Sequence, residues 1–186
     1  LTEFHVTEDT RALLAPAAND PRARCYVNFN FLLQCRSTLT HLTLPCMADS
    51  VVDLLAQLSH LFPALLSLNL RQIDAGVATR LHISVPPLLQ VLQTSGQHPL
   101  SARMFSQPPA LQDAAGQLNM TETFCHLRKL SVSGSRSEEA AQHEFKRFWS
   151  VIFRSKWTKL EHLAVPVVCA SLAPLIEKQC PFLLDL

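Results

Sequence analysis

Glycine is scarce in this chain of 186 residues, which contains only four. Neither G-x-G-x-x-G nor G-x-x-x-x-G-K-[ST] occurs. Both patterns rely on glycine because the backbone must approach phosphate groups closely. The usual nucleotide-binding loops are therefore excluded, and nucleotide hydrolysis is disfavoured.

The spacings that build metal and nucleophile sites are also missing. None of the eight histidines stands in H-E-x-x-H or another zinc-binding spacing, and no G-x-S-x-G elbow occurs. The six cysteines include no C-x-x-C pair. We therefore predict a protein that is not an enzyme, with no catalytic residues, no cofactor and no metal site.

Long apolar runs and a strong net charge are absent as well. No run reaches the roughly 18 apolar residues that a membrane-spanning helix needs, since Pro63, Pro86, Pro87 and Pro181 interrupt the longest stretches. The formal net charge is only +1, so the charge of the whole chain indicates no preference for nucleic acid. No basic-then-apolar leader is visible at the start. We expect no membrane span.

What the chain does have is a recurring apolar spacing, L-x-x-L-x-L. Recognisable copies begin at Leu1, Leu39, Leu65, Leu127, Leu160 and Leu183. A degenerate copy is predicted at Leu89, which lies 24 residues after Leu65 and follows a pair of prolines, although Thr94 replaces its last apolar residue. Because the chain starts and stops within copies, we expect it to be part of a longer array.

This spacing resembles the leucine-rich repeat family in an irregular form. The resemblance implies an α/β fold, a leucine-rich-repeat solenoid with a parallel strand face and helical returns, forming one domain over residues 1–186. The family usually places Asn or Cys at the turn after the strand. Here those positions hold Met47, Ile73, Ser135 and Val168, so apolar packing must stabilise the turns instead.

Two returning helices are predicted by apolar residues at helical intervals. One runs from Asp49 to Leu61 and is ended by Pro63. The other runs from about Cys169 to Gln179, with three residues directed inward: Leu172, Leu175 and Ile176. Residues 95–120 are rich in Gln, Pro, Ser and Ala without clear periodicity, which predicts a mobile insert.

The cysteines are predicted to be buried free thiols. Cys46, Cys125 and Cys180 lie beside strand copies, where a small apolar side chain packs well. Free thiols favour a reducing compartment, so we expect an intracellular protein, whether cytoplasmic, nuclear or organellar.

Alternate residues of each strand copy should face away from the core. Stacking in register would align a first row of Glu3, His41, Ser67, Lys129, His162 and Asp185. A second row would hold His5, Thr43, Asn69, Ser131 and Ala164, and a third Thr7, Pro45, Arg71, Ser133 and Pro166. We predict that partners bind this strand face through His41, Thr43, Ser67, Asn69, Arg71, Lys129, Ser131 and His162.

A basic segment follows the strand copy at Leu127. Residues 137–157 are predicted to form a long helix with an apolar stripe that includes Trp149 and Phe153. Its basic residues are Lys146, Arg147, Arg154 and Lys156. Two interpretations stay open: these residues form the solvated face of a core helix, or they contact RNA phosphates or an acidic protein surface.

Together these features favour a non-catalytic protein-protein interaction scaffold, a subunit of a larger intracellular complex. Two alternatives remain. The basic helix supports a structural component of an RNA-protein assembly such as a ribosome. The irregular repeats are similar to those in the substrate-recognition arm of an F-box-type ubiquitin ligase adaptor.

Overall fold

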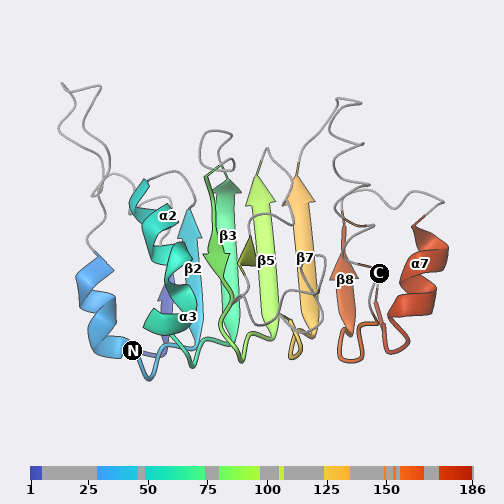
Figure 1. The fold of residues 1–186 in the computed structure, drawn as a ribbon, viewed down its shortest axis with the longest axis horizontal. Coiled ribbons are helices and arrows are strands. Elements are labelled where there is room, and N and C mark those ends of the chain that lie inside the picture. Colours follow the sequence, from blue (N-terminus) through green and yellow to red (C-terminus); the bar gives the residue numbers. More distant parts are fainter. Residues whose placement is uncertain are drawn as a thin grey trace, which may run out of the picture.

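The protein is described by a computed structural model covering residues 1–5, 29–45, 49–73, 80–96, 105–106, 124–134, 149, 153, 156–165 and 172–185. Its main element is a six-stranded, all-parallel sheet, which with the helices makes an α/β fold (Figure 1). The strands stand side by side in chain order: β1 (Glu3–His5), β2 (His41–Pro45), β3 (Ser67–Ile73), β5 (Val91–Gly96), β7 (Lys129–Gly134) and β8 (His162–Ala164).

Equivalent positions of the sequence copies are aligned across this sheet. The second apolar residue of each copy pairs with that of the next copy at one level: Phe4, Leu42, Leu68, Leu92, Leu130 and Leu163. The degenerate copy at Leu89 is confirmed as β5, where Thr94 pairs with Leu70 and is buried. The predicted register is therefore confirmed for the described strands.

The core lies on one face of the sheet, here called the inner face. Leu44, Leu68 and Leu70 are completely buried there, and Leu92 and Leu163 nearly so. Because strand side chains alternate between faces, the leucine spacing places all of them on the same side. Burying apolar area of this kind is the main contribution to folding.

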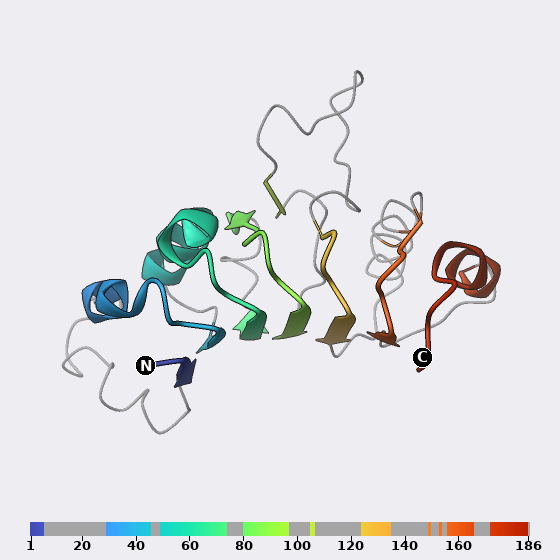
Figure 2. The ribbon, with the colours of Figure 1, turned by 90° about the horizontal axis from the view of Figure 1, so that it is seen from below.

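Helices cover this inner face. In Figure 2, helices α2 (Asp49–Ala56), α3 (Leu58–Leu61) and α7 (Ala173–Gln179) lie on the same side of the sheet. A 3₁₀ helix, η1 (Phe29–Cys35), precedes β2. The helix predicted over 49–61 is confirmed as two helices, separated at Gln57.

Helix α7 corrects one sequence expectation. Leu172 and Ile176 are buried as predicted, but Leu175 is exposed. Leu172 and Ile176 are four residues apart and share one side of the helix, whereas Leu175 precedes Ile176 directly and is turned about 100° from it around the helix axis. The helix itself begins at Ala173, later than the predicted start near Cys169.

The connection from β3 to β5 and the connection from β5 to β7 each contain a short strand. The short strands β4 (Ile83–Ser84) and β6 (Phe105–Ser106) pair in parallel as a second, two-stranded sheet. The hydroxyls of Ser59 and Ser84 form a hydrogen bond that joins α3 to β4. Within the predicted insert 95–120, residues 95–96 belong to β5 and residues 105–106 to β6, and the remainder lies outside the described residues.

A bulge interrupts the register between β3 and β5. Leu70 pairs with Thr94, but Ile73 pairs with Gly96, so β3 contains one extra residue. Gln72 lies in the bulge and has a φ of 54°, in the left-handed region. A Cβ at Gly96 would lie 2.5 Å from the backbone nitrogen of Ile73. The bulge therefore requires glycine at position 96.

The predicted basic helix is described only in part. The Phe153 N–H donates to the Trp149 carbonyl over 2.9 Å, a helical hydrogen bond, and the two buried rings stack at 5.5 Å. The helix does not reach Trp157 as predicted, because Lys156 and Trp157 are not helical and the Trp157 N–H donates to the carbonyl of Gln179 over 2.7 Å. The predicted basic residues Lys146, Arg147 and Arg154 lie outside the described residues.

Among the helices that the structure describes, none has the length and apolar character needed to cross a membrane.

Candidate interaction surface

The outer face of the sheet is the face turned away from α2, α3 and α7, and none of these helices lies on it in Figure 2. Its first row is aligned as predicted, with one addition, Val91 of β5. In order across the sheet the row contains Glu3, His41, Ser67, Val91, Lys129, His162 and Asp185. Six separate segments of the chain thus place polar side chains along one line.

The second row corrects the prediction for Thr43. In order, this row contains His5, Thr43, Asn69, Gln93, Ser131 and Ala164. Thr43 is only 4% exposed and stands between His5 on β1 and Asn69 on β3. A hydrogen bond of 2.8 Å joins its Oγ1 to Nδ1 of His5. Thr43 therefore supports the position of His5 instead of offering a free contact.

The third row is shorter. Pro45 pairs with Arg71, and Ser95 pairs with Ser133. Arg71 is exposed, as a contact residue would be. Thr7 and Pro166, also predicted for this row, lie outside the described residues.

At the β1 end of the first row, a carboxylate stands between two histidines. Glu3 Oε2 lies 3.7 Å from His5 Nε2, and Glu3 Oε1 lies 3.9 Å from His41 Nδ1. Nδ1 of His41 also forms a 2.9 Å hydrogen bond with the hydroxyl of Thr40. These side chains are about half exposed, so these contacts contribute little to stability.

The other end of the row repeats the same chemistry. Asp185 Oδ2 lies 3.9 Å from Nδ1 of His162. Arg128 comes one residue before β7, and Glu161 comes one residue before β8. Arg128 Nη1 lies 3.5 Å from Glu161 Oε1. The outer face thus has a carboxylate and histidine at both ends.

Between these ends the surface is largely uncharged. Ser67, Asn69 and Gln93 offer hydroxyl and amide groups that both donate and accept hydrogen bonds. Lys129 is exposed, and no described residue forms an ion pair with it. These groups can donate and accept hydrogen bonds, and Lys129 adds one positive charge to them.

Gln93 and Val91 were not among the predicted contact residues. Their copy lacks the final leucine, since Thr94 replaces it, so its alternate positions were not assigned to rows. The spacing of Leu89 and Leu92 was the signal that could have placed both residues.

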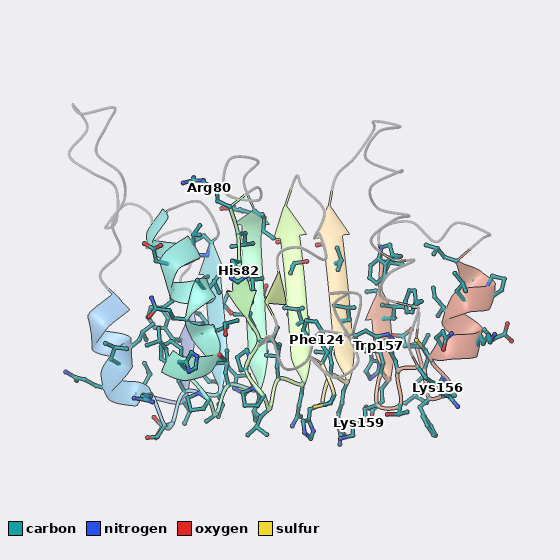
Figure 3. All side chains as sticks on the ribbon, viewed as in Figure 1. Arg80, His82, Phe124, Lys156, Trp157 and Lys159 are labelled. Carbon is teal, nitrogen blue, oxygen red and sulfur yellow. The ribbon has the colours of Figure 1, made fainter. Side chains whose placement is uncertain are left out.

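A group of exposed basic residues, here called the basic cluster, comprises Arg128, Lys129 and Lys159 near the starts of β7 and β8 and Lys156 beside the end of α7 (Figure 3). Figure 3 shows Lys156 and Lys159 at the lower end of the molecule, below the rings of Phe124 and Trp157, which stack at 6.2 Å. Nζ of Lys159 lies 3.2 Å from Nδ1 of His126. Lys156, the one predicted basic-helix residue that is described, is exposed.

In the part of the chain that the structure describes, no three His, Cys, Asp or Glu side chains are grouped so that they could hold a metal ion. His41 and His162 share the first row but belong to strands separated by three others.

The three described cysteines are free thiols but differ in exposure. Cys180 is buried, Cys35 is partly buried and Cys125 is exposed. Burial raises the pKa of the Cys180 thiol to about 11. The prediction of burial is therefore wrong for Cys125, which lies in the turn before β7, outside the core.

No protein-family model matches the chain, and neither the curated proteins nor the solved structures contain a match to it. The function must therefore be inferred from the geometry of the surface itself.

Proposed function

We propose that this protein is a non-catalytic interaction scaffold, a leucine-rich-repeat solenoid that binds a protein partner on the outer face of its sheet. The observation that supports this most directly is the register. One apolar spacing places leucines on the inner face and polar side chains on the outer face in strand after strand. Stacked repeats of this kind create an extended surface that partners can bind.

The chemistry of the outer face favours a polypeptide partner. Its centre supplies amide and hydroxyl groups from Asn69, Gln93 and Ser131, which match the donors and acceptors of another protein surface. Lys129 adds one positive charge that suits a carboxylate. The protein would act as a subunit of a larger intracellular complex.

The test compares two sets of substitutions in the full chain. Ser67→Ala, Gln93→Ala and Lys129→Ala remove three outer-face side chains, while Glu177→Ala and Lys178→Ala remove exposed side chains of α7 as a matched control. Partners that co-purify with the wild-type protein are identified by mass spectrometry, and their affinity is measured for both variants.

We expect the outer-face variant to lose at least about tenfold in affinity and the α7 variant to keep wild-type affinity. Equal retention by both variants would remove the outer face from the proposal. The identity of the partner also separates the alternatives, because ligase subunits would support the F-box-type adaptor role.

The basic cluster favours an RNA-protein assembly as a second candidate. Arg128, Lys129 and Lys159 are exposed near the starts of β7 and β8, and Lys156 is exposed beside the end of α7 (Figure 3). The partly exposed Glu161 forms an ion pair with Arg128. Replacing Lys156 and Lys159 by Gln should flatten the salt dependence of RNA affinity by roughly 0.7 to 0.9 log units per lost phosphate contact. An unchanged slope would exclude phosphate contacts by these lysines.

A further inference from the structure

The positive charges of the basic cluster are unequally compensated. Arg128 Nη1 lies 3.5 Å from Glu161 Oε1, so a carboxylate already pairs with this guanidinium group. Lys129, Lys156 and Lys159 are exposed, and no described residue forms an ion pair with any of them. Three positive charges of the cluster can therefore pair with an anionic group of another molecule.

Lys159 contacts a neutral side chain instead of a carboxylate. Its Nζ lies 3.2 Å from Nδ1 of His126. An ammonium group only donates hydrogen bonds, so Nδ1 accepts and the imidazole carries its proton on Nε2. The contact holds the ammonium group beside His126 without neutralising its charge.

The basic cluster is continuous with the outer face of the sheet. Lys129 pairs with His162 of β8, so it belongs to the first row. The Arg128 carbonyl accepts the His162 N–H over 3.0 Å, which joins β7 and β8 where they begin. Figure 3 shows Lys159 and Lys156 at that same lower end of the molecule. A partner bound on the outer face can therefore extend over the cluster.

The aromatic rings on the two segments that carry the cluster are buried. Phe124 and Trp157 are 4% and 3% exposed, and they stack on each other at 6.2 Å. Proteins usually hold single-stranded RNA through exposed aromatic side chains on which its bases stack, and neither ring can do this. Gln93 and Ser131 of the second row instead offer the hydrogen-bonding groups that suit a polypeptide. These observations favour carboxylates of a protein over phosphates of RNA.

We propose that the basic cluster binds an acidic segment of the protein partner, which runs from Lys129 in the first row over the lower end of the sheet to Lys159 and Lys156. The inference rests on the proposed function and deepens it, because it requires several Asp or Glu side chains beside the part of the partner that contacts the outer face. Charge complementarity of this kind raises the association rate and disfavours basic partners. Added salt should weaken the complex.

The probe is a fluorescein-labelled hexaglutamate peptide, whose binding to the full chain is measured by fluorescence anisotropy at low and at physiological salt. Lys156→Gln with Lys159→Gln should weaken binding at low salt by about three- to tenfold, because two exposed ion pairs are lost. The matched control, Arg36→Gln with Arg80→Gln, removes the same charge from exposed positions elsewhere and should bind as the wild type does. Arg80 lies at the opposite end of the molecule (Figure 3). Thermal unfolding checks that each variant stays folded.

RNA is tested as the occupant with a fluorescein-labelled hexauridylate. It should bind more weakly than hexaglutamate at the same salt concentration. Tighter binding of hexauridylate that Lys156→Gln with Lys159→Gln weakens would overturn the inference in favour of RNA. Undetectable binding of hexaglutamate, or an equal loss in the Arg36 and Arg80 control, would also overturn it.

Failure of this inference can be distinguished from failure of the proposed function. Ser67→Ala with Gln93→Ala leaves all four cations in place, so it tests the outer face alone when affinity for a co-purified partner is measured. Loss of affinity in this variant but not in the Lys156 and Lys159 variant would overturn the acidic segment and support the outer face. Loss only in the Lys156 and Lys159 variant would support the acidic segment and contradict binding on the outer face.

Discussion

The inner and outer faces of the parallel sheet are built from alternate residues of the same strands, and they differ in what each residue contributes. On β3, Leu68 is completely buried under the helices, while its neighbours Ser67 and Asn69 are partly exposed. Substitutions on the inner face remove packing, whereas those on the outer face remove only surface groups. Stability and recognition should therefore be separable within a single strand.

The largest effect is expected from Leu68→Ala at the centre of the inner face. Losing this buried side chain should lower the free energy of unfolding by about 2 to 5 kcal/mol, through lost burial and the cavity left behind. Urea denaturation measures the change. A loss below about 1 kcal/mol would show that the strand leucines do not form a continuous core.

Gly96→Ala should lower the free energy of unfolding by about 1 to 3 kcal/mol, because a Cβ would overlap the backbone of Ile73 at the bulge. The neighbouring Ser95→Ala is the control and should change stability little. If both variants unfold at the same urea concentration, the bulge accommodates the methyl group by shifting.

The buried thiol of Cys180 should make the stability of the protein depend on pH. Burial raises the pKa of this thiol to about 11, from 9.0 for an accessible thiol. As the pH rises, the unfolded chain therefore loses this proton at a lower pH than the folded chain does. Stability should therefore fall as pH rises from 9 to 11, by about 1 to 2 kcal/mol. In the Cys180→Ala variant this part of the pH dependence should disappear, and an unchanged profile would contradict the assignment.

Cys125 and Cys180, the most and the least exposed of the three described cysteines, should also differ in reactivity. Iodoacetamide at neutral pH should modify the exposed Cys125 at least about tenfold faster than the buried Cys180, as quantified by peptide mass spectrometry. Comparable rates would mean that the region around Cys180 opens readily.

The smallest effect is expected on the outer face. Ser67→Ala, Gln93→Ala and Lys129→Ala should each change the free energy of unfolding by less than about 0.5 kcal/mol, because exposed side chains make few contacts to lose. Thermal and urea unfolding check this. A larger loss of unfolding free energy in any of these variants would show that the outer row stabilises the sheet. Stability and recognition would then not be separable between the two faces.

Some of the architecture followed directly from the residue spacing. The interval between leucines predicts both the strand positions and the level at which neighbouring strands pair, as Leu42 and Leu68 illustrate. Strand geometry alternates with a period of two, so a repeated spacing can stack in register with its leucines on one face. The same alternation places the outer-face rows on the opposite side.

Other features depend on neighbours that are distant in sequence. The burial of Thr43 depends on what flanks it from β1 and β3, and the exposure of Leu175 depends on which side of α7 meets the core. The need for glycine at position 96 arises from a bulge in another strand. None of these can be read from the local pattern.

By itself, the sequence determined the repeated unit, the face on which its leucines lie and the polar character of the opposite face, because each depends only on spacing along one strand. Only the tertiary structure decided where the register shifts, which outer-row residues stay accessible, and that Leu184, Phe182 and Leu175 are exposed at one end. The physical reason is that accessibility is a property of what packs against a residue, and here that packing comes from other units of the chain.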